Sequence, residues 1–174
     1  MHPFNVFAGK VFMKFQSVRI LSLFLTGLIA GTFFYGTFSV LPTFYKVPSE
    51  IHLGFRTALM NNNRLVVMAL VLASIVVLAI YTWQVRHIKV VRAFCLTALV
   101  LTIGSLLITR FGSVPINLQI KTWNVDSPPS DWLVILERWD LYNAIRTVAS
   151  IVSFGCLLLA DIWLKNNNEV LKLR

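Results

Sequence analysis

The hydrophobic positions of the chain fall into four long blocks separated by short polar segments. The blocks cover residues 20–44, 65–83, 93–109 and 145–164. Each has about the length, ~17–25 residues, that a helix needs to cross a bilayer. Because an open strand cannot satisfy its backbone hydrogen bonds in lipid, the pattern predicts four transmembrane helices. The first block is uncharged and longer than the ~7–15-residue core of a signal peptide, so we interpret it as an anchor.

Two of these helices are expected to extend beyond the bilayer on its outer side. Pro48-Ser49-Glu50 is a helix start in which Ser49 acts as the cap, and residues 127–131 precede the fourth helix in the same way. A helix over residues 50–83 would be about 50 Å long, which exceeds the ~30 Å hydrocarbon core. Residues 111–129 contain Gly112, Pro115 and the Pro128-Pro129 pair, and we predict that they form the one long loop.

The predicted fold is therefore an all-α membrane protein, a four-helix bundle of residues 19–164. A basic segment, 1–18, precedes it, and a basic cytoplasmic tail, 165–174, follows. In segment 1–18, one helical face carries Phe4, Phe7, Val11 and Phe15 and the other carries Lys10 and Lys14. This arrangement is typical of an interfacial helix. The alternative is a simple basic flank.

Composition supports lipid as the surroundings of this chain. Of its 174 residues 57% are apolar and 13% are charged, whereas soluble domains carry about 25% charged residues. Two cysteines are too few for a disulfide framework or a metal cluster. The net charge of +9 comes from basic residues placed between apolar blocks, so we expect a bilayer as partner and no nucleic acid.

The basic residues also predict an orientation. The flanks on the side of both termini carry basic residues with few acids, whereas those on the other side are interleaved with acidic residues. By the positive-inside rule we place both termini in the cytoplasm and the protein in a plasma or inner membrane.

Polar residues gather where the helices approach the outer side. On the second helix they recur near one face, at His52, Arg56 and Asn63. On the fourth they follow helical periodicity, at Trp132, Glu137, Trp139, Asp140, Asn143 and Arg146. At the end of the third helix and just after it are Arg110 and Asn117. Arg146 lies within apolar sequence, and a charge at membrane depth usually faces the bundle interior or a wet cavity. We predict a shared site, with ordinary interfacial anchoring as the alternative.

Small residues at helical spacing predict close helix packing. Gly27-x-x-x-Gly31 on the first helix is the clearest case. Such glycine-rich faces are also suited to a homo-oligomer or to a membrane partner, and Tyr35 lies one turn beyond Gly31 and borders the space that they leave.

Several of these motifs together resemble a known family. They are Gly31-Thr32-Phe33-Phe34-Tyr35-Gly36 with Leu41-Pro42, Val114-Pro115-Ile116-Asn117, Arg138-Trp139 and Asn143-x-x-Arg146-Thr147. Over residues 20–164 the chain resembles the anthrone oxygenase family of small integral membrane proteins. Many members carry histidine where this chain has Asn143, so a role for that histidine in proton transfer does not carry over.

The resemblance implies four membrane helices and oxidation of an anthrone to an anthraquinone, with no metal and no flavin cofactor. The substrate would be a hydrophobic aromatic or quinone-like small molecule. Such chemistry needs a base, an oxyanion holder and a dry aromatic pocket. The candidates are Glu137, Asp140 or His52 as base, Arg146 and Arg110 for the oxyanion, Asn117 and Asn143 to orient the carbonyl, and Tyr35, Arg56, Asn63, Trp132 and Trp139 to bind the ring system.

Two other functions remain open. The protein could be a non-catalytic membrane subunit or a small-molecule-binding protein, and a transporter is the least favoured because no pair of broken helices recurs. His-x-x-x-His, Cys-x-x-Cys and phosphate-loop motifs are missing from the sequence. His2, His52 and His87 fall on different sides of the membrane in this topology, so no metal site is expected.

Overall fold

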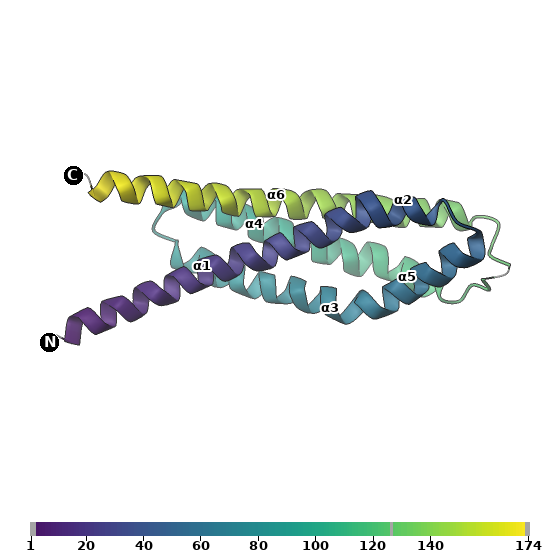
Figure 1. The fold of residues 1–174 in the computed structure, drawn as a ribbon, viewed down its shortest axis with the longest axis horizontal. Coiled ribbons are helices and arrows are strands. Elements are labelled where there is room, and N and C mark those ends of the chain that lie inside the picture. The colour runs from purple at the N-terminus through teal and green to yellow at the C-terminus, as the bar shows by residue number, and fades with distance from the viewer. Residues whose placement is uncertain (1–2, 126, 173–174) are drawn as a thin grey trace.

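The computed structural model describes residues 3–125 and 127–172, with side chains for 16–125 and 127–167, and its regular elements in these ranges are all helices, apart from one isolated bridge between Asn124 and Ser127. The helices join into four rods (Figure 1). They are α1 (Pro3–Tyr35), η1 (Gly36–Val40) and α2 (Leu41–Phe44); α3 (Ser49–Gln84); α4 (Lys89–Ile108), η2 (Thr109–Ser113) and α5 (Val114–Ile120); and α6 (Trp132–Lys172). Each rod contains a helix long and apolar enough to cross a membrane. The predicted all-α class with four membrane-length helices is confirmed.

The rods run up and down, so α1 begins and α6 ends at the same end of the bundle (Figure 1). This terminal end also holds the turn 85–88, whereas the opposite, loop end holds the turn 45–48 and the loop 121–131. α6 packs against α4 and α1, and α3 packs against the same two helices. Both ends of the chain therefore lie on one side of any membrane that the bundle spans, and which side is cytoplasmic stays a prediction.

The interior is apolar near both ends and in the middle. Leu78 and Val91 lie in the apolar cluster near the terminal end, Phe33 lies in the middle cluster, and Leu136 lies in the cluster near the loop end. Large apolar side chains also cover the outside of the helices, as at Leu65, which is 78% exposed. An apolar surface of this kind is stable in lipid and not in water.

The predicted loop over residues 111–129 is wrong in its first half. The third rod continues through η2 and α5 to Ile120, and the loop covers only residues 121–131. Pro115 lies in the first turn of α5, directly after the π-helical turn η2, and a proline is tolerated in the first turn of a helix. Gly112 lies inside the π-helical turn η2, in which an extra residue is accommodated without ending the helix.

The ends of two helices also differ from the prediction. α3 has Pro48 at its cap position and no side-chain cap, so Ser49 does not cap it. α6 continues as a helix to Lys172, beyond residue 164, where the predicted fourth block ends. The backbone of α1 is helical from Pro3, but the side chains of the expected interfacial face, residues 4–15, lie outside the described residues.

The glycine motif of α1 packs on one side only. A Cβ at Gly27 would lie 3.2 Å from the Phe154 ring of α6, whereas no described atom outside its own helix lies within 4 Å of the corresponding position at Gly31. The expected close approach is therefore made at Gly27, whereas none of the described residues outside α1 covers Gly31.

Gly112 allows the closest approach between the third rod and α6. A Cβ at this position would lie 2.9 Å from Cδ2 of Tyr142. Gly112→Ala is expected to lower stability by ~1–3 kcal/mol, because the ring must shift within a packed interface. Gly104→Ala is the matched control: nothing lies within 4 Å of its Cβ position, and alanine favours the helix by about 1 kcal/mol. Thermal unfolding in detergent measures both, and equal midpoints would contradict this prediction.

Candidate functional site

A polar layer crosses the bundle between the middle apolar cluster and the cluster near the loop end. Its residues on α6 recur every three or four positions, which places them on the inward face of that helix. Asn143, Arg146 and Thr147 are buried there, and Asp140 is half-buried. The fourth helix thus carries a continuous polar stripe into apolar surroundings.

Arg146 is the deepest charge of this layer. Its Nη1 donates to Oγ1 of Thr109 at 2.9 Å, and its Nη2 donates to Oδ1 of Asn143 at 2.8 Å. The guanidinium also lies over the ring of Phe33, 4.9 Å from its centroid, in a cation–π arrangement. The cation is therefore held by an amide, a hydroxyl and an aromatic face.

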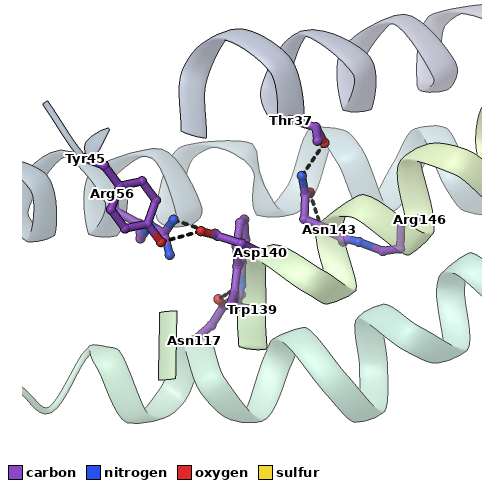
Figure 2. Close-up of polar contacts among 8 residues, drawn as sticks. All are labelled: Thr37, Tyr45, Arg56, Asn117, Trp139, Asp140, Asn143 and Arg146. Atoms are coloured by element: carbon purple, nitrogen blue, oxygen red, sulfur yellow. Dashed lines mark hydrogen bonds and ion pairs between the residues drawn. The ribbon is translucent and has the colours of Figure 1, made fainter. Parts of the chain in front are cut away.

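Asn143 connects Arg146 to the first rod (Figure 2). Its Nδ2 donates to Oγ1 of Thr37 at 2.6 Å. Oγ1 of Thr37 lies 2.6 Å from Oγ1 of Thr147, which is in turn 2.9 Å from the backbone oxygen of Asn143. We call these five residues, Arg146, Asn143, Thr109, Thr37 and Thr147, the Arg146 network.

The Arg146 network contains no acid. Within the described part of the chain, no carboxylate lies within ion-pair distance of Arg146, and its Nε is buried without a hydrogen-bond partner. A buried charge that lacks a counter-ion costs several kcal/mol. The site therefore carries an uncompensated positive charge and one unused donor.

A second group of residues, the Arg56 cluster, lies nearer the loop end. It consists of Arg56, Asp140, Tyr45 and His52. Nη2 of Arg56 contacts Oδ1 of Asp140 at 2.7 Å, and the Tyr45 hydroxyl donates to Oδ2 of the same carboxylate. Arg56 is 1% exposed, and its Nε and Nη1 have no partner among the described residues. Unlike Arg146, this arginine is neutralised by a carboxylate.

Tyr45 is a hydrogen donor in this cluster over the whole ordinary pH range. Partial burial and the hydrogen bond to the Asp140 carboxylate raise the pKa of its hydroxyl well above the usual value. Because the hydroxyl stays protonated, the Asp140 carboxylate keeps two donors, Arg56 and Tyr45.

His52 lies in an aromatic enclosure. Its ring is stacked with Phe44 at 5.3 Å and meets Tyr45 and Trp132 edge to face at 5.0 and 5.6 Å. The side chain is 1% exposed, and Nε2 has no hydrogen-bond partner among the described residues. In the neutral tautomer that carries its hydrogen on Nδ1, this nitrogen is a free acceptor.

Trp139 connects the two groups. The guanidinium carbon of Arg56 lies 4.8 Å from the centroid of its ring and that of Arg146 lies 5.9 Å away. Its Nε1 donates to Oδ1 of Asn117 on α5 at 2.7 Å, and Figure 2 shows the indole between the two arginines. An aromatic ring therefore already occupies the place between the two cations.

Most of the predicted site residues come together in this layer. The set is His52, Arg56, Asn117, Trp132, Trp139, Asp140, Asn143 and Arg146. Four others point away and are exposed: Tyr35, Asn63, Arg110 and Glu137. Arg110 makes only a cation–π contact with its neighbour Phe111, and Asn63 lies in the exposed stretch 61–66 of α3, although it shares a helical face with His52.

Sequence reasoning missed the hydroxyl groups of the site. Thr37, Thr109 and Tyr45 each contact a predicted residue, and Thr147 was noticed only as part of a motif. Threonine is common in membrane helices, where it usually bonds to its own backbone. The single available signal was proximity, because Thr109 precedes Arg110 and Thr37 follows Gly36 at the level of the predicted layer.

Comparison with known proteins identifies a family for this architecture. A sequence model of the family described as anthrone oxygenase matches residues 55–156. The matched segment includes Arg56, Asn117, Asp140, Asn143 and Arg146. No curated protein and no solved structure gives a significant match.

Proposed function

We propose, because this chain belongs to the anthrone oxygenase family, that it oxidises a planar hydrophobic aromatic molecule at the polar layer of the bundle. The observation that carries the proposal is the buried charge of Arg146, held only by neutral groups and with its Nε unused. Such a charge is suited to an oxyanion that forms during the reaction. A neutral ketone would gain less from it than the enolate does, so the interaction favours the charged species.

The reaction needs a proton acceptor and O2. A base removes a proton from the methylene carbon of the anthrone, and the electron pair moves onto the carbonyl oxygen, which Arg146 stabilises. O2 then oxidises that carbon by four electrons: two hydrogens leave, a new carbonyl forms with one oxygen atom, and the other oxygen atom leaves as water. The sum is anthrone plus O2 giving anthraquinone plus water.

His52 is the best of the three candidate bases. Its Nε2 is buried without a partner, whereas Asp140 is engaged by Arg56 and Tyr45 and Glu137 is exposed. The aromatic side chains around His52 and Trp139 are suited to stacking on a planar ring system. The proposed roles are therefore His52 as base, Arg146 for the oxyanion and Asn143 as the amide that orients it.

The proposal is tested with the purified protein in lipid nanodiscs and dithranol, a dihydroxyanthrone. We expect anthraquinone to form faster than in empty nanodiscs, with one O2 consumed per product and oxygen from isotope-labelled O2 in the new carbonyl. A rate equal to that of empty nanodiscs overturns the proposal. Tight binding without oxygen consumption would instead favour the alternative, a non-catalytic membrane protein that binds small molecules.

His52→Gln is expected to lower the oxidation rate by about 10²-fold, because a positioned base contributes at least this factor. Glutamine keeps the approximate size and polarity of the side chain but cannot accept a proton at neutral pH. Glu137→Gln, on the exposed side of α6, is the control and should keep the full rate. A His52 variant as fast as the wild type, beside an impaired Glu137 variant, would move the base to Glu137.

A further inference from the structure

Both π-helical turns of the bundle meet the same arginine network. η1 (Gly36–Val40) contains Thr37, and η2 (Thr109–Ser113) begins at Thr109. Each lies in a different rod, and each directs its threonine hydroxyl at the polar stripe of α6: Thr37 at Asn143, and Thr109 at Arg146. π-helical turns are rare insertions that occur frequently at functional sites.

The hydrogen bonds of Thr109 leave its hydroxyl one role. Its single hydrogen is donated to the backbone oxygen of Ser105 at 2.8 Å, so the oxygen faces Arg146 as an acceptor. A guanidinium only donates, so the donor role of Arg146 matches the acceptor role of the Thr109 oxygen. Thr109 thus holds one arm of Arg146 and adds no negative charge.

The orientation of Asn143 is determined in the same way. Its Oδ1 must be the atom that faces Arg146, because Arg146 only donates, and its Nδ2 therefore donates to Thr37. Thr37 then donates to Thr147, and Thr147 donates to backbone oxygen. The hydroxyls of Thr37 and Thr147 therefore each accept one hydrogen bond and donate another.

Arg56 and Arg146 contact different kinds of acceptor. Three residues before Asn143, Asp140 gives Arg56 a carboxylate, whereas Arg146 receives an amide and a hydroxyl. Asn143 already faces Arg146 through its Oδ1, so an acid at position 143 would neutralise Arg146 as Asp140 neutralises Arg56. The charge of Arg56 is therefore compensated by a carboxylate, whereas the charge of Arg146 remains available to a ligand.

We propose that η1 and η2 hold Arg146 in place through neutral acceptors, so that its charge is reserved for a monoanionic planar ligand. Thr37 and Thr109 are then positioning residues that act through Asn143 and Arg146. The proposal rests on the proposed function for its ligand class. It is tested by ligand binding rather than by turnover, so this inference and the proposed function can fail separately.

The test compares two unreactive probes, an anthraquinone carboxylate and uncharged anthraquinone, on the protein in nanodiscs. The readout is the ratio of their dissociation constants, which we call the anion preference. The wild type is expected to bind the carboxylate more tightly. Asn143→Asp keeps an acceptor for Arg146 but adds a charge, and should lower the anion preference at least tenfold while the thermal midpoint is unchanged or raised.

The threonine variants separate positioning from packing. Thr109→Val and Thr37→Val keep the side-chain shape and should lower the anion preference several-fold, whereas Thr109→Ser and Thr37→Ser should restore it. Asn62→Asp, which adds the same charge at an exposed position of α3, is the control and should leave the preference unchanged.

Two results would overturn the inference. One is an Asn143→Asp protein that keeps the wild-type anion preference, because the charge at Arg146 would then be irrelevant to the ligand. The other is a wild type without any anion preference. If Asn143→Asp does not accumulate in membranes, the valine and serine pairs decide: equal preferences in all four threonine variants would exclude the positioning role.

Discussion

Arg146→Met is expected to reduce the oxidation of dithranol by about 10³-fold, while the protein still folds and accumulates in the membrane. Removal of one preorganised donor to an oxyanion costs ~10²–10³ in rate, and Arg146 would supply both the donor and the charge. Stability should hardly fall, because replacing a buried charge by an apolar side chain of similar volume is often neutral or stabilising. Oxygen consumption and thermal unfolding, measured on the same nanodisc preparation, separate the two effects.

Two further variants make the Arg146 result specific. Arg146→Lys keeps the charge but cannot hold Thr109 and Asn143 through a planar fork, so an intermediate rate is expected. Arg110→Met removes an arginine from nearly the same level of the bundle, but that side chain is exposed and should be dispensable. If Arg110→Met abolishes oxidation and Arg146→Met does not, the oxyanion site has been assigned to the wrong arginine.

Asp140→Ala is expected to be the most destabilising single substitution of the polar layer. It leaves Arg56, which is 1% exposed, as a buried cation without its carboxylate, and it also removes the acceptor of Tyr45. Breaking a buried ion pair from one side costs ~3–5 kcal/mol. We expect about 3 kcal/mol, because the Asp140 side chain is 22% exposed and water can partly replace it.

The double variant Arg56→Met/Asp140→Leu distinguishes charge burial from packing. Without either charge the cluster needs no counter-ion, so the double variant should be more stable than Asp140→Ala by at least 1 kcal/mol. Thermal and denaturant unfolding in detergent measure the series, and Glu137→Gln provides an exposed control on the same helix. If the double variant is less stable than Asp140→Ala, the pair contributes mainly through packing.

Much of the fold was predictable from hydropathy and helix chemistry. The four membrane-length helices follow from apolar blocks that are too long for anything but a bilayer, and the inward face of α6 follows from the spacing of Trp139, Asn143 and Arg146. Periodicity worked on α6 because that helix packs more extensively against α1 and α4 than α3 does. It worked less well on α3, where His52 and Arg56 are buried but Asn63, on nearly the same face, is exposed.

The end of the third rod shows the limit of local signals. Glycine and proline in the segment after Arg110 predicted a loop, but the chain continues as η2 and α5. A π-helical turn needs support from neighbouring helices, and Tyr142 of α6 packs directly against Gly112 there. Thr109 continues the buried face of α4 that carries Thr102 and Ser105, whereas the next residue, Arg110, is exposed.

By itself the sequence determined the four long apolar helices, because lipid requires long apolar helices with internally satisfied backbones. It also indicated the charged, amide and aromatic residues of the polar layer, but not its hydroxyl groups. Only the tertiary structure decided that Asp140 pairs with Arg56 and that Arg146 is left to threonine and asparagine. Those pairings depend on how each helix is rotated and how deep it lies relative to its neighbours. Hydrogen bonds of defined direction between side chains of separate rods fix that arrangement.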